Sequence, residues 1–252
     1  MRLKSLIILM LAFIACFSSC KKAPMSIGKI VTQTRDLPNF SKITLKDDIS
    51  LTLVLSDTCY IEITTGENII DNITTDVVNN ALTISNTTTL DFIRDFDYEL
   101  HATLYYNNRI NNFIYSSSGD INTQNQYNIP DTTNHMFRFE VAGGSGDVKL
   151  LVNDCNYFYV VYQHGTADIN IRGNNNKYLK VYKRSYGDFD ARNYQAKKID
   201  IENHSTGDCY IWATDIINAR ILNLGDIYYK GTPSNITCEY GENARGRLLP
   251  LN

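Results

Sequence analysis

Residues 204–213, HSTGDCYIWA, contain a Gly-Asp pair followed by an apolar residue, and this pattern returns along the second half of the chain. The full set is Gly119-Asp120-Ile121, Gly146-Asp147-Val148, Gly187-Asp188-Phe189, Gly207-Asp208-Cys209 and Gly225-Asp226-Ile227, with Ala167-Asp168-Ile169 as a variant in which alanine replaces glycine. Successive aspartates in the set are 27, 21, 20, 20 and 18 residues apart. A period near 20 residues predicts stacked supersecondary units, each burying its apolar face against its neighbours.

The residues around each aspartate alternate between apolar and other types. Apolar residues stand one and three positions after the aspartate: Val148/Leu150, Ile169/Ile171, Phe189/Ala191, Cys209/Ile211 and Ile227/Tyr229. The intervening residues are Lys149, Asn170, Asp190, Tyr210 and Tyr228, which is the alternation of a β-strand. A second strand is predicted before each aspartate from the pairs Tyr159/Val161, Leu179/Val181, Ile199/Ile201 and Ile217/Ala219. Each repeat is therefore expected to be a strand, a Gly-Asp turn, a second strand and another turn.

The turns suggest their own chemistry. Glycine is expected to supply a positive φ at the Gly-Asp corner, and aspartate to accept hydrogen bonds from nearby backbone N–H groups. Asn174-Asn175-Asn176 is predicted to be a polar turn between strands. Cys209 lies in an apolar column, which favours a small buried side chain over a nucleophile or metal ligand.

These repeats predict an all-β protein. A β-helix-like solenoid of about 20 residues per repeat is the simplest arrangement that buries both apolar columns. A sandwich of short antiparallel strands is the alternative. We expect one domain over residues 30–252, with N-terminal strands and a hairpin over 30–115 and the Gly-Asp repeats over 116–252.

The N-terminal half carries strand signals of its own. Alternating apolar residues predict strands over 43–45, 49–55 and 59–63. The segment 77–84, with Asn79-Asn80 at its centre, predicts a hairpin because asparagine tolerates the positive φ that its turn needs.

The first residues predict export and anchoring. MRLKSLIILMLAFIACFSSC has a basic start and an apolar run too short to span a membrane, so residues 1–19 are predicted to be a lipoprotein signal peptide. Ser18-Ser19-Cys20 resembles a lipobox, in which Cys20 would carry the lipid and residues 20–29 would form a short linker. Phe17 departs from the leucine usual at its position, and an ordinary signal peptide is the alternative. We expect a protein of the bacterial cell envelope, lipid-anchored and in the outer membrane; the sequence leaves open which face.

The charge and the cysteine content limit which ligands and crosslinks we expect. The formal net charge of −3 gives no electrostatic reason to expect nucleic-acid binding. Beyond Cys16 and Cys20, the cysteines are Cys59, Cys155, Cys209 and Cys238, whose three alternative disulfide pairings the sequence cannot rank. Their wide spacing argues against a zinc site.

Neither a cofactor nor an enzymatic site is expected. His164 and His204 would lie about 10 Å apart on stacked strands, too far to share a zinc ion. The aspartate column could bind calcium, but the known calcium-binding repeat has a different spacing, and a structural turn is favoured. A polysaccharide-active enzyme resembling pectin lyases would use such acidic residues, yet a regular column is what structure alone would produce.

Tyrosine is abundant, at 17 residues. Its rings bury contact area at low entropic cost, which suits glycan or protein ligands. The candidate binding surface consists of Tyr162, Tyr182, Tyr186, Tyr210 and Tyr228. The alternative is that these tyrosines only reflect the strand propensity of the residue.

Several motifs together resemble the head GIN domain family of auto-transporter adhesin-like proteins, found in envelope lipoproteins of Bacteroidetes-type bacteria. They are Phe40-Ser41-Lys42-Ile43, Glu67-Asn68, Ala81-Leu82-Thr83-Ile84, the serial Gly-Asp repeats and Tyr228-Tyr229-Lys230-Gly231-Thr232-Pro233, covering about residues 30–252. The family's repeated Gly-Ser-Gly-Asp motif occurs in this sequence only at Gly144-Ser145-Gly146-Asp147. The resemblance implies a right-handed β-helix-like fold and an adhesion role. We expect a non-enzymatic adhesin that binds a glycan or another macromolecule. A periplasmic scaffold lipoprotein that binds an envelope protein is the alternative function.

Overall fold

The computed structural model describes residues 27–88, 100–107, 110–125, 127–128 and 136–251. The predicted signal peptide, Cys20 and most of the predicted linker lie outside these residues. Within them, no helix is both long enough and apolar enough to cross a membrane.

The described chain is almost entirely β-structure, as predicted. Its one helix is a single 3-10 turn, η2 (Ile70–Asn72). The strands are β1 (Ile30–Asp36), β2 (Lys42–Asp47), β3 (Ser50–Leu55), β4 (Tyr60–Gly66), β5 (Ile73–Val78), β6 (Ala81–Asn86), β7 (His101–Tyr106), β8 (Asn112–Ser117), β9 (Ile121–Thr123), β10 (Tyr127–Asn128), β11 (Met136–Val141), β12 (Val148–Asn153), β13 (Tyr157–Tyr162), β14 (Ile169–Lys183), β15 (Phe189–Asn203), β16 (Cys209–Ile221), β17 (Ile227–Lys230), β18 (Asn235–Tyr240) and β19 (Leu248–Pro250).

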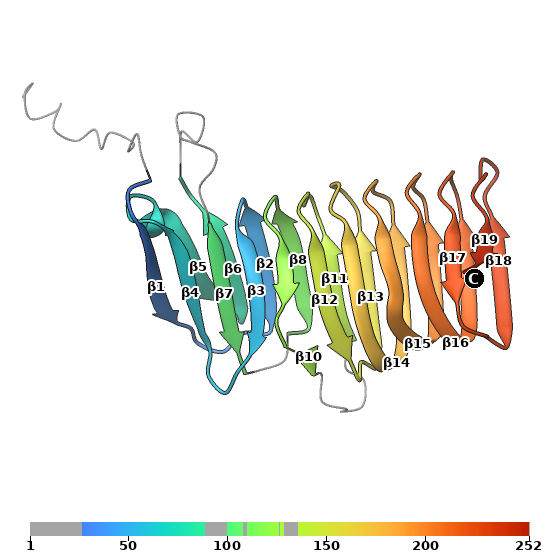
Figure 1. The fold of residues 1–252 in the computed structure, drawn as a ribbon, viewed down its shortest axis with the longest axis horizontal. Coiled ribbons are helices and arrows are strands. Elements are labelled where there is room, and N and C mark those ends of the chain that lie inside the picture. Colours follow the sequence, from blue (N-terminus) through green and yellow to red (C-terminus); the bar gives the residue numbers. More distant parts are fainter. Residues whose placement is uncertain (1–26, 89–99, 108–109, 126, 129–135, 252) are drawn as a thin grey trace, which may run out of the picture.

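The strands lie side by side along the long axis of the molecule in two layers (Figure 1). The first layer runs β1, β4, β7, β3, β9, β12, the first halves of β14, β15 and β16, then β17 and β19. The second runs β5, β6, β2, β8, β11, β13, the second halves of β14, β15 and β16, then β18. One hydrophobic core fills the space between them.

Many residues about 20 positions apart in the sequence pair with each other. In the first layer Ile169 pairs with Phe189 and Phe189 with Cys209, and in the second layer Leu179 pairs with Ile199. Pairings among the strands from β11 onward are all parallel, whereas the alternative sandwich would need antiparallel ones. Among the described strands, antiparallel pairs occur only at the N-terminal end, between β1 and β4, β4 and β7, and β5 and β6.

The predicted hairpin is confirmed at β5 and β6. Val78 pairs with Ala81, and the two-residue loop is Asn79-Asn80, with φ values of 50° and 63°. Both central residues with positive φ match the hairpin turn that follows the natural twist of the strands.

The apolar columns face the core as expected. Cys209 is fully buried in register with Phe189 and Ile227, which confirms that it is an inward apolar side chain. The residues that follow Phe189 and Cys209 in the sequence, Asp190 and Tyr210, are partly exposed. This alternation places the side chains that a ligand could reach on the outer faces of the two layers.

The prediction for the Gly-Asp glycines is wrong. Among the glycines with positive φ are Gly165 and Gly173, but none of the five glycines of the Gly-Asp pairs. Those glycines are needed because the backbone of the preceding repeat passes too close for a side chain. A Cβ built on Gly187 would lie 1.9 Å from the carbonyl oxygen of Ala167, and one on Gly225 would lie 2.2 Å from that of Gly207.

The aspartates also accept hydrogen bonds from residues that are farther away in the sequence than predicted. The Asp168 carboxylate accepts a hydrogen bond from the backbone N–H of Asp188 at 2.8 Å, and Asp208 accepts one from Asp226 at the same distance. Asp120 and Asp147 form a similar pair. The carboxylate therefore joins one repeat to the next instead of closing its own turn.

The predicted turn at Asn174-Asn175-Asn176 lies inside the continuous strand β14. The chain bends there instead, with a positive φ at Gly173 and Asn175 and a shift in register between Gly173 and Asn176. This bend carries β14 from the first layer to the second.

Candidate functional site

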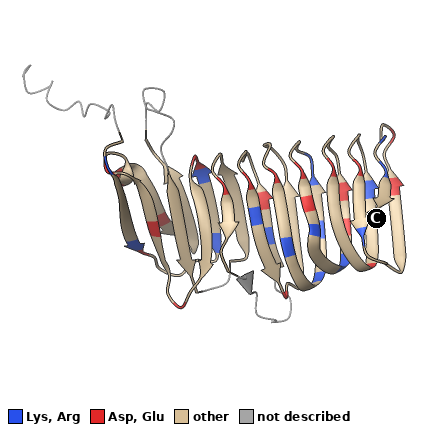
Figure 2. Ribbon diagram, viewed as in Figure 1, with Lys and Arg blue, Asp and Glu red and all other residues tan. Residues whose placement is uncertain are grey.

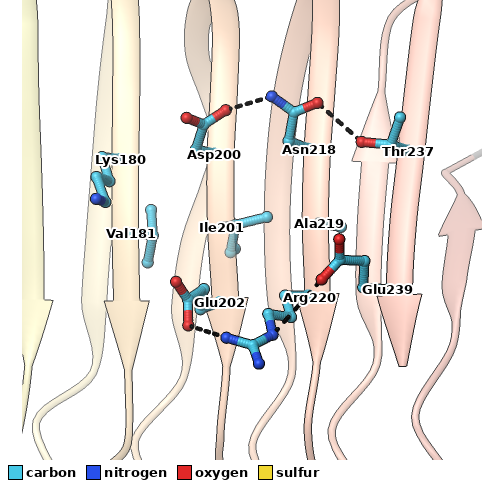
Figure 3. Close-up of a pocket in the computed structure, with 10 residues that line it drawn as sticks. All are labelled: Lys180, Val181, Asp200, Ile201, Glu202, Asn218, Ala219, Arg220, Thr237 and Glu239. Carbon is cyan, nitrogen blue, oxygen red and sulfur yellow. Dashed lines mark hydrogen bonds and ion pairs between the residues drawn. The ribbon is translucent and has the colours of Figure 1, made fainter. Parts of the chain in front are cut away.

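A groove lies on the outer face of the second layer, near the C-terminal end of the stack (Figure 3). It encloses about 590 Å³, including space that is open to solvent. The lining residues come from β14, β15, β16 and β18 and are Lys180, Val181, Asp200, Ile201, Glu202, Asn218, Ala219, Arg220, Thr237 and Glu239.

Strand alternation explains why this face is polar. Val181, Ile201 and Ala219 point into the core and are at most 5% exposed, so their backbone forms the floor of the groove. The residues on either side of them along each strand point outward. Parallel pairing in register aligns these outward residues into two rows that cross the strands.

The first row is a chain of hydrogen bonds. Asn218 donates through Nδ2 to Asp200 Oδ1 at 2.7 Å, and its Oδ1 accepts from the Thr237 hydroxyl at 2.8 Å. The Tyr178 hydroxyl also donates to Asp200. These contacts fix the amide and the carboxylate in one orientation, and both side chains remain partly exposed at the surface of the groove (Figure 3).

The second row is held by ion pairs. Arg220 lies between two carboxylates, with Nη1 3.5 Å from Glu202 Oε2 and Nε 3.8 Å from Glu239 Oε2. Glu202 also contacts His204 Nε2 at 3.2 Å. The side chains of Arg220 and Glu239 are 50% and 80% exposed, so these pairs contribute little to stability and the guanidinium remains accessible to a ligand.

Aromatic rings extend the groove toward the middle of the stack. Tyr159 pairs in register with Lys180, whose Nζ lies 5.4 Å from the ring centroid, and Arg138 covers the same ring at 4.9 Å. Tyr182 packs against the His204 ring at a centroid separation of 4.9 Å. The face therefore combines flat aromatic surfaces with hydrogen-bonding groups.

Both signs of charge occur on these strands (Figure 2). Among the lining residues, Asp200, Glu202 and Glu239 carry negative charge, and Lys180 and Arg220 carry positive charge. The carboxylates outnumber the cations, which disfavours a polyanionic ligand.

The structure separates the five predicted tyrosines. Tyr182 borders the groove, whereas Tyr210 and Tyr228 stack on each other in the first layer, with ring centroids 5.1 Å apart. Tyr186 is 71% exposed and lies between β14 and β15. Tyr210 also stacks under the guanidinium of Arg192 at 4.0 Å.

Tyr162 is not on a binding surface, because it is fully buried. The pairing explains the error: Tyr162 is in register with Lys183, not with Tyr182, so it belongs to an inward column. The repeat between β13 and β14 is one residue longer than the spacing of 20 that would align the two tyrosines.

That inward column is polar, and the sequence alone did not indicate it. The hydroxyls of Tyr115 and Tyr162 and the Nδ2 of Asn203 donate to backbone carbonyls of the nearby Gly-Asp turns. Lys183, fully buried, donates through Nζ to Ser205 Oγ at 2.5 Å and to the Gly207 carbonyl at 3.2 Å. Burial lowers the pKa of Lys183, although the nearby Cys209 thiol and Asp188 oppose the shift.

The cysteines beyond Cys20 are thiols in the structure. Burial raises the pKa of both Cys155 and Cys209 to about 12, so neither is a reactive thiolate at neutral pH. The described residues hold no cluster of three or more His, Cys, Asp or Glu side chains that could bind a metal ion.

Comparison with known proteins identifies relatives of the whole repeat region. The model of the family described as "Putative auto-transporter adhesin, head GIN domain" matches residues 39–233. A crystal structure from Bacteroides fragilis, described as a "putative adhesin", has 20% identity and a TM-score of 0.76, covering 90% of this chain and 99% of its own. A "putative lipid binding protein" from Parabacteroides distasonis has 19% identity and a TM-score of 0.61, covering 89% and 98%.

A further "putative adhesin" from Parabacteroides merdae has 18% identity and a TM-score of 0.53, covering 89% of this chain and 97% of its own. No curated protein matches the chain. The family and these neighbours are described as adhesins or binding proteins, and none as an enzyme.

Proposed function

This chain belongs to the head GIN domain family, and we propose that it is a cell-envelope adhesin whose groove on the second layer binds a glycan. The observation that carries the proposal is the pair of outward rows, in which a fixed carboxylate, amide and guanidinium face solvent beside tyrosine rings.

The chemistry of the rows suits sugar hydroxyls. A carboxylate such as Asp200 accepts hydrogen bonds, the Arg220 guanidinium donates them, and the Asn218 amide does both. Tyr182, which is partly exposed beside the His204 ring, offers an apolar surface on which a sugar ring can pack. Because carboxylates outnumber cations in the groove, we propose a neutral glycan and not a uronate or another polyanion.

Lipid binding fits this groove less well. The Parabacteroides distasonis neighbour is named for it, but an acyl chain needs an apolar cavity. The apolar side chains at the groove, Val181, Ile201 and Ala219, are turned into the core.

We further propose that the two-layered fold is a β-solenoid of about 20 residues per repeat. Parallel in-register pairing of successive repeats in both layers, and the bends that carry β14 to β16 from one layer to the other, support it. In such a fold the outward residues of consecutive repeats form long rows, which gives an extended ligand several subsites.

The glycan site is tested with a glycan array probed by the purified chain and three variants. Asn218→Ala removes the amide that joins Asp200 to Thr237, and Arg220→Ala removes the central cation; both should lower binding to the preferred neutral glycan at least about tenfold. Arg192→Ala is the matched control, an arginine paired with Asp190 and stacked on Tyr210 in the other layer, and should bind like the parent.

Any other pattern of binding among the parent chain and the three variants would exclude the groove as the glycan site. Loss of binding in Arg192→Ala alone would move the site to the Tyr210–Tyr228 stack. A parent chain that binds no neutral glycan would contradict the adhesin proposal and favour the scaffold alternative.

We also propose that Cys20 anchors the protein by its lipid. Acyl chains add about 0.8 kcal/mol of membrane affinity per buried CH₂ group. Cys20→Ala should therefore shift the protein from the membrane fraction to the soluble fraction, with Cys59→Ala as the control that stays membrane-bound. Unchanged fractionation of Cys20→Ala would exclude lipidation as the anchor.

A further inference from the structure

The last strand of the second layer leaves part of its inward apolar surface exposed, although Cys238 is partly buried against the core. In the preceding strand β16, the inward residues Ile217, Ala219 and Ile221 are between 0% and 5% exposed. Their register partners in β18 are Ile236, Cys238 and Tyr240, of which Ile236 is 40% and Tyr240 57% exposed. The core therefore continues to the C-terminal end of the stack, where apolar side chains meet solvent.

The backbone of β18 is also open on that side. β18 pairs with β16 along one edge, and no strand of the described chain pairs with its other edge. Exposed strand edges are templates for pairing and are commonly blocked by proline or by an inward-pointing charge. β18 has neither, whereas β19, the end strand of the first layer, carries Pro250.

The N-terminal end is built differently. Arg35 of the edge strand β1 points inward and donates to the carbonyls of Ile70 and Ile73, at 3.0 Å and 2.5 Å. This contact joins the ends of the two layers through η2 and β5 and places a charge where a docking strand would bury its side chains. A second copy could not add its β18 there, so head-to-tail stacking is disfavoured.

We propose that β18 is the docking surface for β18 of a second copy of this chain, in an antiparallel pair on a two-fold axis. The strand is complementary to itself in one central register, with Cys238 opposite Cys238 of the second copy. Ile236 then faces Tyr240 of the second copy, and Thr237 faces Glu239 of the second copy.

The alternation of β18 is compatible with this register and excludes registers that are shifted by one residue. Opposed residues in an antiparallel pair point to the same face, so the pairing joins the two cores and keeps polar residues outside. A shift by one residue would place Ile236 opposite Glu239 and send apolar side chains into solvent. An interface in which the same patch serves both copies is the commonest form of oligomer.

The pairing also bears on the proposed function, although it does not depend on it. Thr237 and Glu239 line the groove, so the dimer would bring two grooves together across the axis. A branched or repetitive ligand could then occupy both sites at once, which raises avidity without new contacts.

Sedimentation equilibrium of the full chain in detergent tests the dimer. The parent should be dimeric at micromolar concentration, and Ile236→Lys, which places a charge in the joined core, should be monomeric. Asn235→Lys adds the same charge on the outward face of the same strand and should remain dimeric. A monomeric parent, or a dimer that survives Ile236→Lys, would overturn the proposal.

Thiol crosslinking tests the register without relying on those variants. Oxidation of the parent by diamide, which takes two electrons and two protons from a pair of thiols, should yield a disulfide-linked dimer. Cys238→Ser should abolish the crosslink and Cys59→Ser should retain it. A crosslink that survives Cys238→Ser would place the interface elsewhere.

Discussion

Single residues show why the Gly-Asp pair recurs. Both members act between repeats: the glycine lets the neighbouring backbone approach, and the aspartate accepts a hydrogen bond from the next repeat. The sequence revealed the recurrence but pointed to a local turn, because the same residue pair is common in turns for different reasons. Only the stacked structure distinguishes a positive φ from a close backbone approach.

Gly187→Ala should destabilise the protein by about 2–3 kcal/mol, since the new methyl group would lie 1.9 Å from the Ala167 carbonyl oxygen. Gly143→Ala is the control, because its Cβ would come no closer than 3.3 Å to Ser116 Oγ. Urea unfolding of both variants measures the difference. Equal stability of the two would refute the close-approach explanation.

Lys183→Met should unfold no more easily than the parent at pH 7. The substitution removes a charge from the core, and Ser205 keeps a hydrogen bond to Asn203 Oδ1. Because burial lowers the pKa of Lys183 below its usual 10.5, the unfolded chain binds more protons than the folded chain between the two values. The stability of the parent should therefore rise relative to the variant as pH increases through that window.

Urea unfolding of the parent and Lys183→Met across this pH range checks the sign. A stability difference that stays constant up to pH 10.5 would mean that Lys183 is solvated in the folded protein.

At the scale of elements, strands were easier to predict than the boundaries between them. Alternation identified the strands of both layers and the β5–β6 hairpin, because one buried face imposes a period of two. It failed at Asn174-Asn175-Asn176, where hydrogen bonding across repeats keeps one strand continuous through a bend. It also failed at Tyr162, where one extra residue in a repeat turned a predicted outward side chain into the core.

The groove was not predicted because no single residue in it is unusual. Asp200, Asn218 and Arg220 occupy ordinary outward positions of strands that the sequence did reveal. Their significance arises from register, which aligns residues about 20 positions apart. An alignment of the outward positions of successive repeats could have identified these groove residues from the sequence.

The column of aspartates should not need metal. Asp120, Asp168 and Asp208 each accept a backbone hydrogen bond from the following repeat, which already satisfies a carboxylate oxygen. Addition of a calcium chelator should therefore leave the melting temperature unchanged, as differential scanning calorimetry would measure. A large drop would show that calcium links the repeats.

At the scale of the whole molecule, the two ends and the two faces have different roles. The N-terminal end is closed by antiparallel strands and Arg35, and the C-terminal end is open at β18. The outer face of the second layer carries the groove. An adhesin must reach the cell exterior, so protease added to intact cells should digest the protein; protection until the envelope is opened would favour the periplasmic scaffold.

Hydrogen–deuterium exchange of the chain with and without its preferred array glycan would show whether a glycan binds in the groove. We expect slower exchange in peptides covering 198–203, 216–221 and 235–240, with no change over 189–192 and 209–213. Protection confined to the latter segments, or none anywhere on the second layer, would contradict this expectation.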